Sequence, residues 1–206
     1  MSIIEVKGSL FDVPEGSILV HACNCLGSWG SGIARAFKKK YPTAYNRYAA
    51  FCKSHLRVPE IIDLGEEAGD IRYAQRPLGS ALLIHPPPPP TAGAAATTTA
   101  TQGARPIKKK RTEGKKHYVA CLFTSHGFGS RGLAPPEDVL IYTRFAMRDL
   151  LQQVRELRER GETGKVYMCR FNSGLFRVNW EDTRAVVESV AREMDFDEEM
   201  FVVVPE

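Results

Sequence analysis

Short apolar runs alternate with amphipathic segments along most of the chain, and this alternation constrains the fold more than any other feature. The run Ile18–Cys23 is almost continuously apolar, which is typical of a central strand covered on both faces. Apolar residues between Met147 and Leu157 recur every three or four positions, as on one face of a helix. Strands and helices that alternate at this spacing predict a layered α/β domain with a parallel or mixed sheet.

The expected elements follow from this patterning. We expect strands at residues 3–7, 18–23, 81–84, 118–123, 166–171 and 201–204. We expect helices at residues 33–40, 43–54, 135–160 and 180–193. Pro42 ends the first helix, Thr43 caps the second and Asn179 caps the last.

Residues 86–116 break the pattern. Five consecutive prolines, Pro86–Pro90, lead into an Ala/Thr-rich stretch with almost no large apolar residue before Ile107. Such a segment buries too little to offset the entropy of ordering it. We interpret it as a disordered insertion in a surface loop of one domain that spans residues 1–206, because strands are expected on both sides of it.

The net charge of +4 comes from one short tract. Between Arg105 and Lys116, seven basic residues and one glutamate give a local charge of +6, so the rest of the chain is mildly acidic. Charge therefore predicts no nucleic-acid-binding core. The tract suits nuclear import or nucleic-acid contact, but we favour a plain solvated charge run.

The five cysteines and five histidines show no metal-ligand spacing. We expect reduced cysteines, no metal and no cofactor, in a cytoplasmic or nuclear monomer. No apolar run approaches the ~20 residues of a membrane span, and the first residues do not resemble a secretory signal. The motifs of P-loop nucleotidases, cysteine phosphatases, zinc peptidases and serine hydrolases are all missing.

Two strand–loop–helix junctions remain as candidate ligand sites. The first carries Asn24 at the end of a strand and then Gly27, Gly30 and Gly32, which allow the backbone to approach a phosphate at a helix N-terminus. Asn24 suits sugar hydroxyls. A tight turn that only needs glycine explains the same pattern.

The second junction, Asn172–Val178, is small and polar at its start and also leads into a helix. Two such loops at the carboxyl ends of strands suit a diphosphate that lies between them. Trp180 is more typical of a core anchor than of a stacking residue.

The chain resembles macrodomains, the ADP-ribose-binding fold, and within them the fungal ADP-ribose 1″-phosphate phosphatase branch. The resemblance rests on VKGSLF at 6–11, HACNCLGSWGSGIA at 21–34, CLFTS at 121–125 and FNSGLFRVNW at 171–180. These words occur in family order and span the domain outside the insertion. The resemblance implies a three-layer α/β/α sandwich with a mixed central sheet.

The resemblance also implies ligand contacts. The adenine would contact Gly8, Ser9 and Leu10, with Asp12 as the substitute for an aspartate that many macrodomains carry where Ser9 stands. The distal ribose would contact Ala22, Cys23 and Asn24. The first phosphate loop would comprise Gly27, Ser28, Trp29, Gly30, Ser31, Gly32 and Ile33. The second would comprise Asn172, Ser173, Gly174, Leu175, Phe176, Arg177 and Val178.

The implied reaction is hydrolysis of ADP-ribose 1″-phosphate to ADP-ribose and phosphate. We hypothesise that His21, directly or through Asn24, activates the attacking water, with His126 as the second candidate. A buried core role for His21 fits the strand pattern equally well. Phosphate monoesters hydrolyse extremely slowly, and no metal or covalent nucleophile is evident, so we expect slow, metal-independent turnover.

Two other functions remain open. One is a non-catalytic reader of ADP-ribose or of ADP-ribosylated proteins, and the other is removal of mono-ADP-ribose from proteins. Related ester hydrolases use a lysine and an aspartate where this chain has Ser125 and Phe176, which argues against their covalent mechanism. We expect neither a membrane nor a nucleic acid as a partner of the core.

Overall fold

A six-stranded mixed sheet forms the centre of the protein in the computed structural model, which describes residues 2–67, 70–87 and 116–206. Its strands are β1 (Ile3–Lys7), β2 (Ile18–Asn24), β5 (Ala81–Ile84), β6 (Tyr118–Ser125), β7 (Val166–Met168) and β8 (Met200–Val204). Their order is β1-β8-β7-β2-β6-β5, and only the pairing of β5 with β6 is antiparallel. Among the described residues, no helix is both long and apolar enough to cross a membrane.

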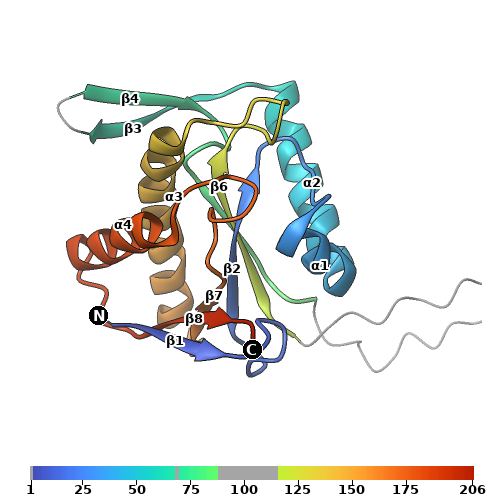
Figure 1. Ribbon diagram of the computed structural model, residues 1–206, viewed down its shortest axis with the longest axis vertical. Helices are drawn as coiled ribbons and strands as arrows, with labels where there is room; N and C mark the ends of the chain where they lie inside the picture. The colour runs from blue at the N-terminus through green and yellow to red at the C-terminus, as the bar shows by residue number, and fades with distance from the viewer. Residues whose placement is uncertain (1, 68–69, 88–115) are drawn as a thin grey trace, which may run out of the picture.

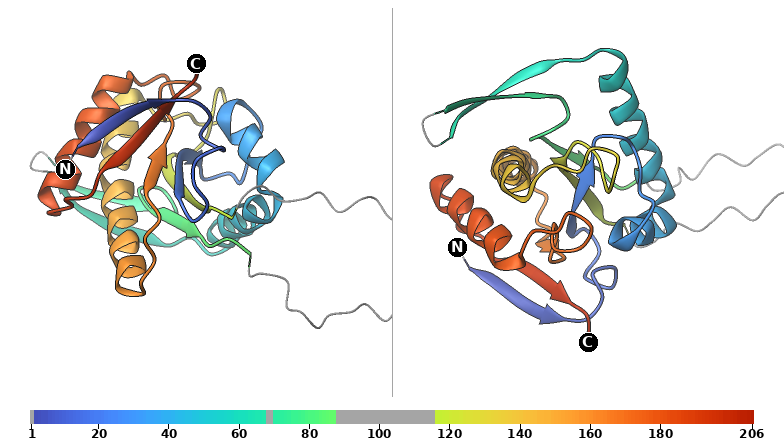
Figure 2. Two further views of the ribbon diagram at one scale, coloured as in Figure 1. Left: turned by 90° about the horizontal axis from the view of Figure 1, so that it is seen from below. Right: turned by 45° about the horizontal axis from the view of Figure 1, so that its top comes forward.

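Helices cover both faces of this sheet. The pair α1 (Gly32–Lys40) and α2 (Pro42–Arg57) lies on one face, and the pair α3 (Pro136–Glu159) and α4 (Trp180–Glu193) lies on the other (Figures 1 and 2). Each side has its own apolar core, one built around α3 and α4 and one rich in aromatic rings beneath α1 and α2. The prediction of a three-layer α/β/α sandwich is therefore confirmed.

Several local predictions are also confirmed. The side chain of Asn179 caps α4 by accepting a hydrogen bond from the Glu181 amide at 3.4 Å. Trp180 is buried in the core next to Phe171 and anchors the start of α4. All five cysteines are free thiols.

Two predictions of local structure are wrong, and one pair of strands was not predicted. Thr43 lies inside α2 and does not cap it, because Pro42 already occupies the first turn. The strand expected at 166–171 ends at Met168, since the Phe171 amide bonds back to the Cys169 carbonyl in a turn. The antiparallel hairpin of β3 (Ile61–Glu67) and β4 (Asp70–Gln75) was missed. Isoleucines and a tyrosine in these two runs were the available sequence signal, and it is weak.

The strands that flank the proline-rich insertion are neighbours in the sheet. Ile84 of β5 pairs with Val119 of β6, so the chain leaves and re-enters the domain at one place. The predicted disordered insertion at 86–116 itself lies almost entirely outside the described residues.

One carboxylate joins the two helices on the same face. Glu193 of α4 receives hydrogen bonds from Arg144 at 2.6 Å and Arg148 at 3.0 Å, both on α3. The hydrogen bond from Arg144 is the main cause that lowers the pKa of Glu193 from 4.5 to about 2. The ionised form is thus favoured in the folded protein.

We expect Glu193→Gln to lower the melting temperature, with a loss that depends on pH. A depressed carboxyl pKa stabilises the fold above pH 4.5, and this contribution disappears as the pH falls through about 2. The difference between wild type and variant should therefore shrink between these values in thermal melts followed by circular dichroism. Glu199→Gln is the control, because its single contact to Lys165 is solvent-exposed. A difference that stays constant with pH would contradict this assignment.

Candidate functional site

Three loops meet at the carboxyl edge of the sheet. Strand β2 lies between β7 and β6 and runs parallel to both, so the segments that follow these strands emerge at the same edge. They are residues 25–31, 126–135 and 169–179, the blue, yellow and orange connections near the upper ends of β2 and β6 in Figure 1. This edge is where ligands bind in open α/β sheets. Both loops that were predicted to hold phosphate therefore begin at this edge, and their binding of phosphate stays a prediction.

Asn24 organises the first of these loops from beneath. Its side-chain oxygen accepts hydrogen bonds from the amides of Leu26 at 3.0 Å and Ser28 at 3.3 Å, and its side-chain nitrogen donates to the Ser28 carbonyl at 2.7 Å. The Tyr48 hydroxyl donates to the Asn24 backbone carbonyl at 2.7 Å. The side-chain amide of Asn24 is thus bonded mainly to the loop itself and shapes the site, and its contact with a sugar stays a prediction.

The side chain of Trp29 anchors the centre of the same loop in the core. Its side chain is 1% exposed and stacks on the Tyr48 ring with 4.9 Å between centroids. Gly27 has a φ of +71°, a backbone conformation that residues with a side chain rarely adopt, so this position favours glycine. With the indole anchored below, the exposed part of the loop is backbone, at Gly30, Ser31 and Gly32.

The N-terminus of α1, like that of α2, differs from those of α3 and α4 in its charge. Ser31 occupies the cap position but makes no side-chain cap hydrogen bond, and the first turn of α1 holds no acidic residue. The first turns of α3 and α4 each hold a glutamate and an aspartate. A helix N-terminus exposes amide donors and a partial positive charge. At α1 these donors are available to an external anion.

The second loop is held by Asn172, which has a φ of +64°. Its side chain is buried, accepts a hydrogen bond from Thr124 at 2.9 Å and donates to Thr143 at 2.8 Å. It ties the loop to β6 and α3. Ser173, Gly174 and Leu175 project outward beyond this anchor, with Leu175 58% exposed.

A third loop, which the sequence did not assign to the ligand, completes this edge. The Ser125 hydroxyl donates to the Gly127 carbonyl and accepts from the Ala134 amide, both at 3.0 Å. The Cys25 amide donates to the His126 carbonyl at 3.0 Å and joins this loop to the first one. A Cβ at Gly127 would lie 1.7 Å from the Arg131 carbonyl oxygen, so the tight turn depends on glycine. His126 itself is exposed.

The three loops at this edge carry charges of one sign, whereas the first turns of α3 and α4, which follow two of these loops, are acidic. The three loops contain Arg131, Arg170 and Arg177 and no aspartate or glutamate. Arg170 forms an ion pair with Glu5 at 3.0 Å, while Arg131 and Arg177 are exposed. This composition, together with the α1 N-terminus, favours an anionic ligand.

His21 lies inside the aromatic core beneath the first loop. Its ring is fully buried, stacks on Phe37 at 4.1 Å and meets Trp29 edge-on at 4.8 Å. Its ring nitrogens lie 3.6 Å from the Cys23 sulfur. The geometry corresponds to the core alternative for His21, and its assignment as the base stays a prediction.

Three potential metal ligands come together here that sequence spacing did not reveal. The ligand atoms of His21, Cys23 and Cys121 all lie within 4.8 Å of one another, and all three residues are buried. Spacing missed them because Cys121 comes from another strand, opposite His21 in the register.

Four of the five cysteines are poor candidates for a nucleophile. Burial raises the pKa of Cys52 and of Cys169 to about 12 and the pKa of Cys23 and Cys25 well above the usual range. Their thiols are therefore neutral near pH 7, and a neutral thiol is a poor nucleophile.

The predicted ligand residues fall into two groups. Those at the surface or partly exposed are Gly8, Ser9, Ala22, Gly27, Ser28, Gly30, Ser31, Gly32, Ile33, Ser173, Gly174, Leu175 and Arg177. Those with buried side chains are Leu10, Cys23, Asn24, Trp29, Asn172, Phe176 and Val178. For the buried group, side-chain contact with a ligand stays a prediction. Their side chains hold the loops in place.

The predicted adenine residues follow β1. The Gly8 amide donates to the Val204 carbonyl at 2.9 Å, and the Ser9 carbonyl accepts from the Asp12 amide at 3.0 Å. Ser9 and Asp12 are exposed, whereas Leu10 packs into the aromatic core. The choice between Ser9 and Asp12 for adenine recognition stays open.

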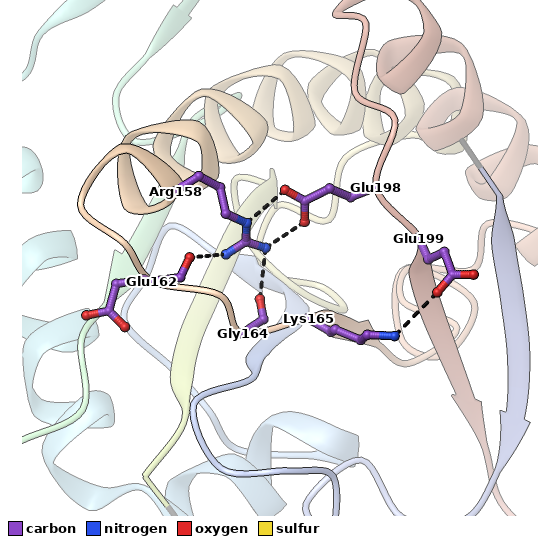
Figure 3. A network of polar contacts seen from close by, with 6 residues as sticks. All are labelled: Arg158, Glu162, Gly164, Lys165, Glu198 and Glu199. Carbon is purple, nitrogen blue, oxygen red and sulfur yellow. Dashed lines mark hydrogen bonds and ion pairs between the residues drawn. The ribbon is translucent and has the colours of Figure 1, made fainter.

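A shallow hollow of about 470 Å³ lies at the opposite edge of the sheet, where β7 and β8 begin. There the Arg158 guanidinium binds both carboxylate oxygens of Glu198, at 2.7 and 2.8 Å, and the carbonyls of Glu162 and Gly164 (Figure 3). Lys165 pairs with Glu199 at 3.4 Å. These charges are already matched within the protein, so this network clamps two connections and is not a ligand site.

The fold and the anion-suited edge define a class of protein, and comparisons with known proteins agree. The macro domain family model matches residues 20–68. The macrodomain of Mycobacterium tuberculosis DarG superposes with a TM-score of 0.61 at 20% identity, covering 100% of this chain and 99% of that one.

Curated fungal proteins are similar over nearly the whole chain. One from Aspergillus oryzae, named ADP-ribose 1″-phosphate phosphatase, is 38% identical over an alignment of 213 positions that covers 96% of each chain. A protein of the same name from Aspergillus clavatus is 40% identical, covering 93% of this chain and 92% of its own. The chain belongs to the macro domain family.

We expect Ser31→Asp to separate stability from binding. An aspartate at the cap of α1 interacts favourably with the helix N-terminus, so the melting temperature should stay constant or rise. The same carboxylate would repel a diphosphate, and affinity for ADP-ribose should fall at least about tenfold, or about 1.4 kcal/mol. Calorimetric titration with ADP-ribose and thermal melts measure the two effects.

Asn46→Asp provides the matched control, because it adds the same charge on the exposed side of α2. Its affinity for ADP-ribose should equal that of wild type. Unchanged binding in Ser31→Asp would remove the α1 N-terminus from the site.

Proposed function

We propose that this protein hydrolyses the terminal phosphate of ADP-ribose 1″-phosphate and releases ADP-ribose and inorganic phosphate. The observation that carries the proposal is the uncapped N-terminus of α1 at an edge whose three loops hold arginines and no carboxylate. The shared name of the fungal relatives, at 38–40% identity over more than nine-tenths of the chain, supports the choice of substrate.

The diphosphate would lie between the first and second loops. Backbone amides around Gly30 and Ser31 would bind it on one side and those of Ser173 and Gly174 on the other. The arginines at this edge would attract the additional negative charge of the terminal phosphate. In such a site, preorganised amides also stabilise charge that develops on the phosphoryl oxygens.

We assign the activation of water to His126. It is exposed at the carboxyl end of β6, and its carbonyl holds the Cys25 amide, which places it next to the first loop. The imidazole would accept a proton from the attacking water as the new phosphorus–oxygen bond forms and the bond to the ribose oxygen breaks. His21 is less suited, because its nitrogens are enclosed by Trp29, Phe37 and Cys23.

We propose a modest turnover without a catalytic metal. Magnesium binds through carboxylates, and none stands in the three loops. The buried thiols are neutral, so a covalent thiol route is disfavoured. General base catalysis and amide donors alone supply less acceleration than metal or covalent routes.

Removal of ADP-ribose from proteins by the lysine–aspartate mechanism has little support. The position of the lysine is Ser125, whose hydroxyl is fully used in holding the third loop. The position of the aspartate is Phe176, which packs with Val139 and Val178. A non-catalytic reader remains the outcome to expect if ADP-ribose binds and no phosphate is released.

We expect His126→Ala to lower kcat for phosphate release by about 10²–10⁴-fold, the usual contribution of a general base. Affinity for ADP-ribose should change little, because the loop is held by the backbone of residue 126. Phosphate release from ADP-ribose 1″-phosphate with EDTA present measures the first quantity, and calorimetry measures the second.

His85→Ala is the control, since His85 follows β5 at the other end of the sheet. Full turnover in His126→Ala would refute the assignment. If His21→Phe, folded and able to bind ADP-ribose, were inactive instead, the base would be His21.

A further inference from the structure

The imidazole of His21 has an unusual environment for a buried histidine. A neutral imidazole carries one donor and one acceptor nitrogen, and a buried ring normally satisfies both. Within the described part of the chain, the Cys23 sulfur at 3.6 Å is the one hydrogen-bond partner that either nitrogen has. Aromatic rings occupy the space above and beside the imidazole.

Two thiols complete this environment. His21 and Cys23 are two residues apart on β2 and therefore point to the same face of the sheet. Cys121 is paired with His21 across the β2–β6 ladder. The three ligand atoms lie within 4.8 Å of one another, and sulfur and nitrogen atoms that share a tetrahedral or trigonal metal are separated by about 3.5–4 Å.

We propose that His21, Cys23 and Cys121 form a buried binding site for one thiophilic d¹⁰ cation, Zn²⁺ or Cu⁺. Two thiolates and an imidazole are soft ligands that select these ions over magnesium or calcium. Binding Zn²⁺ displaces the two thiol protons and gives a site with no net charge, which suits an apolar interior. The number of ligands, by contrast, favours Cu⁺, which is commonly bound by three. Both ions would be recognised by the same feature, which is a small set of soft ligands that is closed to solvent.

Trp29 connects this site with the first loop. Its indole N–H donates to the Cys23 sulfur at 3.3 Å, a contact that stabilises a metal-bound thiolate from outside the ligand set. Trp29 also anchors the loop that carries Gly30 and Ser31. A bound cation would therefore hold β2, β6 and the first loop together as a structural brace and would not touch the substrate.

The test uses wild-type protein refolded with one cation at a time, because the ligands are fully buried. Co²⁺ serves as the probe for the zinc arm, through the near-ultraviolet thiolate-to-cobalt absorption and its loss on adding Zn²⁺. Competition with bicinchoninate under reducing conditions serves the Cu⁺ arm. We expect one cation per chain in one arm and a higher melting temperature than for protein refolded with EDTA.

The variants Cys121→Ser and Cys23→Ser should lose the cobalt absorption or the bound Cu⁺. Cys52→Ser is the matched control, because it also replaces a buried cysteine beside the same loop but lies outside the three-residue cluster. If Cys121→Ser does not fold, the cation content of the refolded wild-type protein still tests the proposal. Less than a tenth of a cation per folded wild-type chain in both arms, or full binding in folded Cys121→Ser, would overturn the proposal.

Discussion

The parallel pairing of β2 with β7 on one side and β6 on the other decides where each loop of the site lies. Because all three strands run in the same direction, their following segments emerge together at one edge. The ladder between β2 and β6 is regular up to Cys23 and then shifts register, so that Asn24 pairs with Ser125. This irregularity occurs at the carboxyl ends of the two strands, where their residues begin to bond to the loops.

Polar side chains at this edge act mainly on the protein itself. Asn24, Asn172 and Ser125 are buried, and the side chain of each forms hydrogen bonds with a neighbouring loop or strand. A buried polar group must be paired to avoid a large desolvation cost, and these three are paired by the segments that they position. The surface left for a ligand is consequently mostly backbone, supplemented by arginines. Because these hydrogen bonds position the loops in the absence of a ligand, an anion can bind to them with little reorganisation.

The sequence predicted the layers well because periodicity reports burial directly. The apolar face of α3 can only be read as a helix, and the apolar run of β2 only as a buried strand. Asn179, a typical helix cap, marked the start of α4. The hairpin of β3 and β4 was missed because polar and apolar residues alternate in it only weakly. The shortened β7 could not be foreseen, since its end is set by a local turn after Met168.

The site was predictable in place but not in detail. Glycine spacing and the family resemblance located the first and second loops. They did not reveal that the side chains of Asn24 and Trp29 turn inward, because side-chain direction at a strand end depends on register and on neighbours from distant segments. The cluster of His21, Cys23 and Cys121 depends on the β2–β6 ladder, which joins residues a hundred positions apart and leaves no mark in local spacing.

The central claim is that exposed backbone amides of two neighbouring loops bind the diphosphate of ADP-ribose. It is tested most directly by following amide resonances in two-dimensional ¹H–¹⁵N spectra while ADP-ribose is added. The account predicts saturable shifts at Gly30, Ser31, Ser173 and Gly174, with little change around Lys165 at the opposite edge. Absence of shifts in both loops, or shifts confined to the opposite edge, would contradict it.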